Sequence, residues 1–172
     1  MLAILNRVFI LLSCAVLIHC ADTTKYQAEF RGNWVLEARK NAQGQSFKEP
    51  EISGVLEWYP IANDRAHVLM TFSTGPETLQ SFDGVYQVNG DSFTRKPSLR
   101  IGGPLGGPID ETYEAMGQTL AGQIKSEDAR TVLTHSDGSE FEFIGAQLIV
   151  TYKNGVVDRW KRLRDLKGTL AK

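Results

Sequence analysis

The chain of 172 residues has only two cysteines, Cys14 and Cys20, and none after position 20. The rest of the chain therefore has no thiol with which to form an internal disulfide or a cysteine-containing zinc site. Charge of either sign is not in excess, with 19 basic and 20 acidic residues. A nucleic-acid-binding domain is typically strongly basic, so we expect no nucleic-acid partner. No long apolar run follows the first twenty residues, and we expect no later transmembrane helix.

Side chains that commonly carry catalysis are also sparse. Only His67 and His135 follow the first twenty residues, and they lack the spacing of paired metal ligands. His135 is followed by a serine and an aspartate, but these residues lie in an expected turn, which explains them better than a catalytic triad does. Glu111 and Glu114 are the least improbable acid/base pair. We therefore expect a protein that is not an enzyme and that holds neither a metal nor a cofactor.

The first 21 residues have the layout of an export signal. Arg7 lies in a cationic start, an apolar run extends to residue 18, and His19-Cys20-Ala21 follows. Three outcomes remain open: lipidation of Cys20, lipidation of Cys14, and ordinary cleavage after Ala21. We expect an exported protein of the periplasm or cell envelope. Its only link to a membrane would be a lipid on Cys20, which would anchor it at the outer membrane.

From residue 32 onward, short runs of strand-forming residues alternate with turn residues. The runs occupy residues 33–39, 54–59, 66–73, 82–88, 92–95, 130–134, 140–144, 148–153 and 156–163. Asn-Gly at 89–90 and 154–155 and Asp-Gly at 137–138 are strong signals for tight hairpins. The pattern predicts an all-β domain, an antiparallel meander closed into a barrel of about eight strands. A sandwich of two sheets is the alternative.

Alternation along these runs separates an inward face from an outward face. In residues 33–39, Trp34, Leu36 and Ala38 share one face, and Arg39 falls on the other. The side chains that we expect to face the interior and to line a cavity are Leu36, Leu56, Trp58, Met70, Phe72, Tyr86, Phe141, Phe143, Val150 and Tyr152. Trp58 and Tyr86 are the aromatic residues that we expect on the cavity wall.

The two ends of the strand pattern suggest how the barrel closes. Gly32-Asn33-Trp34 opens the first run, and Arg-Trp-Lys-Arg-Leu at residues 159–163 closes the last. In a closed barrel the first and last strands pair, so a guanidinium from one can lie over the indole of the other. Alternation from Trp160 selects Arg162 for this closure contact with Trp34. Together with the turn at residues 84–91, these motifs resemble the lipocalin-like families, in particular bacterial lipocalin-like envelope proteins.

The resemblance covers about residues 28–165 and implies an organisation for the chain. Residues 1–21 are the export signal, 22–30 a polar lead-in, 31–165 the lipocalin-like barrel and 166–172 a basic tail. The disulfide and full loop motifs of secreted vertebrate lipocalins are absent. A glycine–proline run at residues 101–109 is either a surface connection or a lid beside a cavity. It lacks the lysine that a phosphate-binding loop requires.

The implied function is non-covalent binding of a small apolar or amphipathic ligand. A barrel of eight strands encloses just enough space for side chains or for one small ligand. Two alternatives remain. A core filled by side chains would favour a structural or protein-interaction module of the envelope. A carboxylate or histidine on a cavity wall would favour a barrel isomerase or hydratase.

Overall fold

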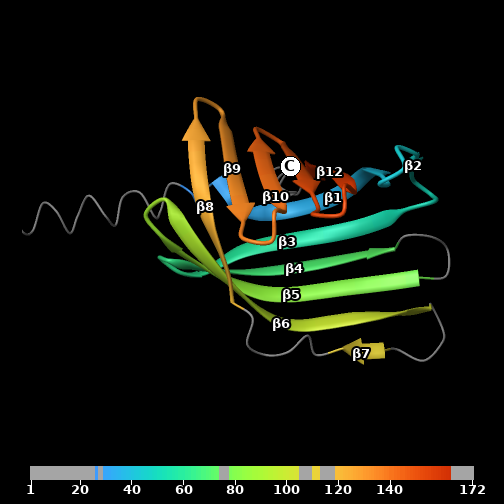
Figure 1. The fold of residues 1–172 in the computed structure, drawn as a ribbon, viewed down its shortest axis with the longest axis horizontal. Coiled ribbons are helices and arrows are strands. Elements are labelled where there is room, and N and C mark those ends of the chain that lie inside the picture. Colours follow the sequence, from blue (N-terminus) through green and yellow to red (C-terminus); the bar gives the residue numbers. More distant parts are fainter. Residues whose placement is uncertain (1–25, 27–28, 74–77, 105–109, 113–118, 164–172) are drawn as a thin grey trace, which may run out of the picture.

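The computed structural model describes residues 26, 29–73, 78–104, 110–112 and 119–163, and it contains twelve strands in these ranges (Figure 1). They are β1 (Gly32–Lys40), β2 (Ser46–Lys48), β3 (Ser53–Ala62), β4 (Arg65–Ser73), β5 (Thr78–Asn89), β6 (Ser92–Pro104), β7 (Asp110–Thr112), β8 (Leu120–Glu127), β9 (Arg130–His135), β10 (Glu140–Ile144), β11 (Gln147–Thr151) and β12 (Val157–Arg162). Cys14, Cys20, the rest of the predicted signal, the basic tail, and the side chains of Glu111 and Glu114 lie outside the description. No helix among the described residues is long and apolar enough to span a bilayer.

The strands form a closed antiparallel barrel. Their order is β1-β3-β4-β5-β6-β8-β9-β10-β11-β12, and β12 pairs again with β1. Figure 1 shows the long strands β3–β6 on one side and the shorter strands β8–β12 on the other. The predicted all-β antiparallel meander closed into a barrel is confirmed, and the sandwich is excluded. The ring holds ten strands rather than about eight, while β2 pairs with β1 and β7 pairs with β6 outside it.

The strand of the closed ring that the sequence pattern misses is β8, and the short outer strands β2 and β7 are absent from the pattern as well. The inward positions of β8 alternate with exposed ones, but they include Gly122 and Ser126, and Ile124 is the only one classed as buried. A period of two is hard to recognise when half of the inward residues are small or polar. Pairing with both β6 and β9 holds this segment in the sheet.

Gly122 is required by the close packing of this strand. A Cβ at this position would lie 2.2 Å from Cζ of Phe93 and 2.5 Å from the carbonyl oxygen of Thr134. We expect Gly122→Ala to lower the free energy of unfolding by about 1–3 kcal/mol or more, because one of these groups must move. Chemical denaturation would measure the loss. Ala121→Val, which adds volume on the exposed face, is the control, and an equally small effect of both substitutions would contradict the prediction.

A bulge in β1 makes the predicted facing of its second half wrong. Leu36 pairs with Trp160, but Ala38 pairs with Arg159 and Arg39 with the buried Asp158. One extra residue on β1 between Leu36 and Ala38 reverses the faces that follow, as a β-bulge does. Arg39 therefore points into the barrel instead of outward.

The glycine–proline run also differs from the prediction. Residues 101–104 belong to β6 and pair with β5, and the remaining residues of the predicted loop, 105–109, lie outside the description. β6 pairs with β8 over Ser92–Arg95 and, farther along, with β7. Past Arg95 the two sides of the barrel are therefore no longer joined by direct pairing of β6 with β8.

One end of the barrel is filled by part of the predicted polar lead-in. Tyr26 and Phe30 are helical and buried, and Phe30 is only 1% exposed. The Phe30 ring lies 5.1 Å from Trp58 and 4.5 Å from Phe143, measured between centroids. The hydroxyl of Tyr26 donates a hydrogen bond to Asp91 at 2.8 Å. These residues are therefore part of the barrel core, whereas the sequence placed them before it.

Candidate functional site

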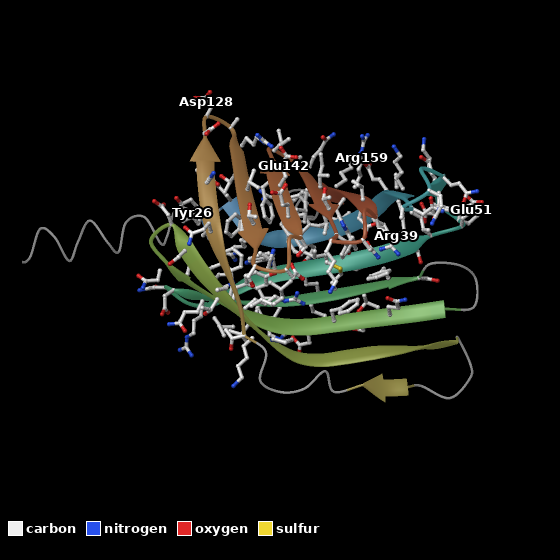
Figure 2. The ribbon with its side chains drawn as sticks, viewed as in Figure 1. Tyr26, Arg39, Glu51, Asp128, Glu142 and Arg159 are labelled. Atoms are coloured by element: carbon white, nitrogen blue, oxygen red, sulfur yellow. The ribbon has the colours of Figure 1, made fainter. Side chains whose placement is uncertain are left out.

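A cavity of about 480 Å³ lies in the barrel at the end away from Phe30. Its volume is within the range of small-molecule sites. The apolar part of its wall comes from Val68, Met70, Phe72, Phe82, Tyr86, Leu120, Phe141, Tyr152 and Val156. Its polar lining includes Arg39, Arg95, Asp137, Ser139 and Lys153. Figure 2 shows Arg39 directed toward the barrel interior, whereas Arg159 of the neighbouring strand projects outward.

The structure divides the residues that the sequence assigned to ligand binding into two groups. The residues that line the cavity are Met70, Phe72, Tyr86, Phe141 and Tyr152. Leu56, Trp58 and Phe143 are buried in the core and do not line it. Trp58 packs between Phe143, at 5.7 Å, and Tyr86, at 4.7 Å between ring centroids. Trp58 is thus separated from the cavity by Tyr86 and is not a wall residue.

An ion pair between Arg39 and Asp158 occupies one side of the cavity. Nε of Arg39 donates to Oδ1 of Asp158 and Nη2 donates to Oδ2, each at 2.6 Å. The hydroxyl of Tyr152 donates to the same carboxylate at 2.9 Å. The Arg39 guanidinium also lies 4.3 Å from the centre of the Phe72 ring. Burial opposes the charge of Arg39, but the hydrogen bonds and charge of Asp158 raise the pKa of Arg39 overall. Burial, followed by the charge of Asp158, raises the pKa of Tyr152.

This pair does not follow from the predicted strand alternation. Asp158 lies two residues before Trp160 and therefore shares its inward face, which was a usable signal for a buried carboxylate. Arg39 could not be found in the same way, because the bulge that turns it inward depends on its pairing with β12. The side chain of Asp158 is fully buried, so the pair forms a fixed polar contact in the wall.

A second polar group lies behind the cavity wall. The hydroxyl of Tyr86 is 2.8 Å from Nε2 of His135, and Nδ1 of His135 is 3.3 Å from the carbonyl oxygen of Ser139. His135 therefore donates from Nδ1 and accepts from Tyr86, which is the pattern of a neutral imidazole. Burial, followed by the nearby charge of Arg95, lowers the pKa of His135 to about 4. Burial raises the pKa of Tyr86 to about 12.

The residues after His135 form a turn and not a triad. Asp137 accepts hydrogen bonds from the backbone nitrogen of Ser139 at 2.9 Å and from its hydroxyl at 2.6 Å. Burial opposes ionisation of Asp137, but these two hydrogen bonds lower its pKa overall. Within the described ranges, no three His, Cys, Asp or Glu side chains gather in an arrangement that could hold a metal ion.

The low pKa of His135 predicts a pH-dependent stability. Its pKa rises from about 4 in the folded protein to an ordinary value of about 6.5 on unfolding. Between these values the unfolded chain binds a proton that the folded protein does not, so the free energy of unfolding falls as the pH falls. The slope contributed by one such group is at most about 1.4 kcal/mol per pH unit.

Denaturation measured across this pH range would test the assignment. His135→Gln should flatten the dependence, because the amide can still accept from Tyr86 but does not titrate. Gln123→Ala, on the exposed face of β8, removes no titratable group, so it is the control and should keep the wild-type slope. Equal slopes in the two variants would show that His135 does not carry the effect.

The contact between Trp34 and Arg162 joins the first and last strands. The two residues are register partners, and Cζ of Arg162 lies 4.4 Å from the centre of the Trp34 ring. Arg162 also donates to the carbonyl oxygen of Glu29, and burial lowers its pKa. Gly32 has φ +152° and lies beneath this side chain, where a Cβ would be 3.4 Å from Nε of Arg162. The Gly-x-Trp motif thus combines a glycine-specific backbone with a site for the guanidinium.

Comparison of the chain with protein-family models and with curated proteins gives no match. Two solved structures resemble it. One is a de novo designed fluorescence-activating β-barrel with 14% identity and a TM-score of 0.37, and the match covers 83% of this chain and 98% of that chain. The other is a lipocalin-like protein from Bacteroides uniformis with 14% identity and a TM-score of 0.34, covering 78% of this chain and 99% of that chain. The closed barrel described above rests on its own strand pairing.

Proposed function

We propose that the barrel binds one small apolar or amphipathic molecule in its cavity and does not act on it chemically. The observation that carries this proposal is the contrast between the two halves of the interior. Phe30, Trp58 and Phe143 fill one end, while about 480 Å³ beside Met70 and Phe72 is not occupied by side chains. An apolar wall with a few polar groups is typical of a binding site for a small molecule.

The polar groups around the cavity favour binding over catalysis. Asp158 is held by Arg39 and Tyr152, and Asp137 is held by Ser139. General acid–base catalysis needs a group that can reach the substrate and change its protonation near the working pH. Neither Asp158 nor Asp137 combines these two properties, so the isomerase or hydratase alternative has less support.

Polarity added to the apolar wall should weaken ligand binding. Met70→Gln keeps the side-chain length but exposes an amide to the cavity, whereas Leu69→Gln makes the same change on the outward face of β4. The delipidated domain would be titrated with fatty acids, retinoids and haem-like pigments while tryptophan fluorescence is followed. We expect saturable binding that Met70→Gln weakens and Leu69→Gln does not. Equal affinities in both variants would place the ligand outside this cavity.

A second candidate function is a protein-interaction module that uses the outer surface. Val55, Tyr59 and Ile61 of β3 are large apolar side chains that are 42%, 42% and 52% exposed, so they are available for contact with a partner. If none of these ligands binds and the interior excludes a small apolar probe such as xenon, the carrier proposal fails and this alternative replaces it.

We also propose that the protein is exported to the periplasm or cell envelope, because its first 21 residues have the layout of an export signal. The mature protein is expected to begin at Cys20, Ala21 or Asp22. The intact mass of the protein from the membrane fraction would distinguish a diacylated Cys20 from ordinary cleavage, and Cys20→Ser would remove the lipid if it is present. Recovery of a cytoplasmic protein that still begins at Met1 would contradict export.

A further inference from the structure

Arg95 lies along the inner wall of the cavity. It is the register partner of Tyr86, and its Cζ is 5.9 Å from the centre of the Tyr86 ring. The neighbouring inward position on β5 is Gly84, where a Cβ would lie 3.4 Å from Nε of Arg95. A larger residue at position 84 would crowd the guanidinium, so Gly84 leaves the room in which Arg95 lies against the wall.

The charge of Arg95, unlike that of Arg39, is not paired with a carboxylate among the described residues. Arg39 is neutralised by Asp158 through two hydrogen bonds, and Asp137 and Lys153 are both exposed residues of the lining with opposite charge. The cavity therefore carries one uncompensated positive charge, and a ligand with a negative group would be attracted to it.

Resting on the proposed function, we infer that the ligand is an amphipathic anion whose negative head group binds Arg95 and whose apolar body lies against Met70, Phe72 and Phe141. The planar guanidinium presents a fork of donors that suits a carboxylate or a phosphate. Tyr86 supplies an aromatic face beside it, and its hydroxyl is already engaged by His135. Arg95 is thus the residue that selects the head group of the ligand.

The test compares two ligands with the same apolar chain and different heads. Dodecanoate and dodecanol would be titrated into the delipidated domain at a pH where the carboxylate is ionised, with calorimetry as the measurement. Loss of a hydrogen bond to a charged group typically costs about 1.5–3 kcal/mol, so the wild type should bind dodecanoate at least about tenfold more tightly than dodecanol. Arg95→Gln should abolish this preference by weakening dodecanoate binding while leaving dodecanol binding unchanged.

Two variants make the result specific. Arg159→Gln removes an exposed cation on the outer face of β12 and should keep the preference for dodecanoate. Arg95→Lys keeps the charge without the fork and should keep part of the preference, which also provides a folded variant if Arg95→Gln does not fold. Equal affinities of the wild type for both ligands, or an unchanged preference in Arg95→Gln, would overturn the inference while leaving the carrier proposal in place. Binding of neither ligand, nor of the other ligand classes named above, would overturn both.

Discussion

Replacing Trp34 with alanine should lower the free energy of unfolding by about 3–5 kcal/mol, the usual loss for a buried aromatic side chain. The side chain is fully buried and packs edge-on against Phe143, with 5.7 Å between ring centroids. On its other side it carries the guanidinium of Arg162 at 4.4 Å. Because the total stability of a domain is about 5–15 kcal/mol, this single change could leave the barrel largely unfolded.

Two further variants separate the parts of this effect. Val35→Ala, at the outward position next to Trp34, is the control and should cost much less. Arg162→Ala removes the cation–π contact, which contributes about 1–2 kcal/mol when desolvated. A double-mutant cycle of Trp34 and Arg162 would measure their coupling directly. A loss below about 1 kcal/mol for Trp34→Ala would show that barrel closure does not depend on this contact.

Asp158→Ala should be of similar severity, with an expected loss of about 3–5 kcal/mol. The substitution leaves the Arg39 guanidinium in the barrel wall, where its side chain is 11% exposed and its carboxylate partner is gone. Tyr152 would lose its carboxylate acceptor at the same time and keep only the weaker contact with the sulfur of Met70. Denaturant unfolding of the variant would measure the loss.

The loss of stability in Asp158→Ala should come from the unpaired charge of Arg39 and not from the loss of the ion pair as such. The double variant Arg39→Met/Asp158→Leu removes both charges, and it should recover much of the stability lost in Asp158→Ala. Glu37→Gln is the surface control: Glu37 faces Lys161 across 3.5 Å, both side chains are about half exposed or more, and the effect should be within about 0.5 kcal/mol. If Asp158→Ala cost no more than this control, the Arg39–Asp158 pair would not be a buried pair in solution.

The inward positions of β4, β5, β10 and β11 follow from the sequence because their alternation is local. Inward residues two positions apart are Met70 and Phe72 on β4, Tyr86 and Val88 on β5, Phe141 and Phe143 on β10, and Leu148 and Val150 on β11. The antiparallel order follows from the same signal, since tight turns can join only neighbouring strands that run in opposite directions. β8 was missed because Gly122 and Ser126 lie on its inward face, so this face shows little alternation in hydrophobicity.

By itself, the sequence determined the all-β meander and most of the residues that point inward, because these depend on a period of two and on short turns. It favoured closure into a barrel over a sandwich, and the pairing of β12 with β1 decided between the two. Only the tertiary structure decided that the bulge after Leu36 turns Arg39 toward Asp158, because a bulge is defined by the register with another strand. It also decided that Phe30 fills one end while a cavity remains at the other. The volume left empty is a difference between the space that ten strands enclose and the side chains that occupy it. That difference depends on all the strands together, and no single segment of the sequence contains it.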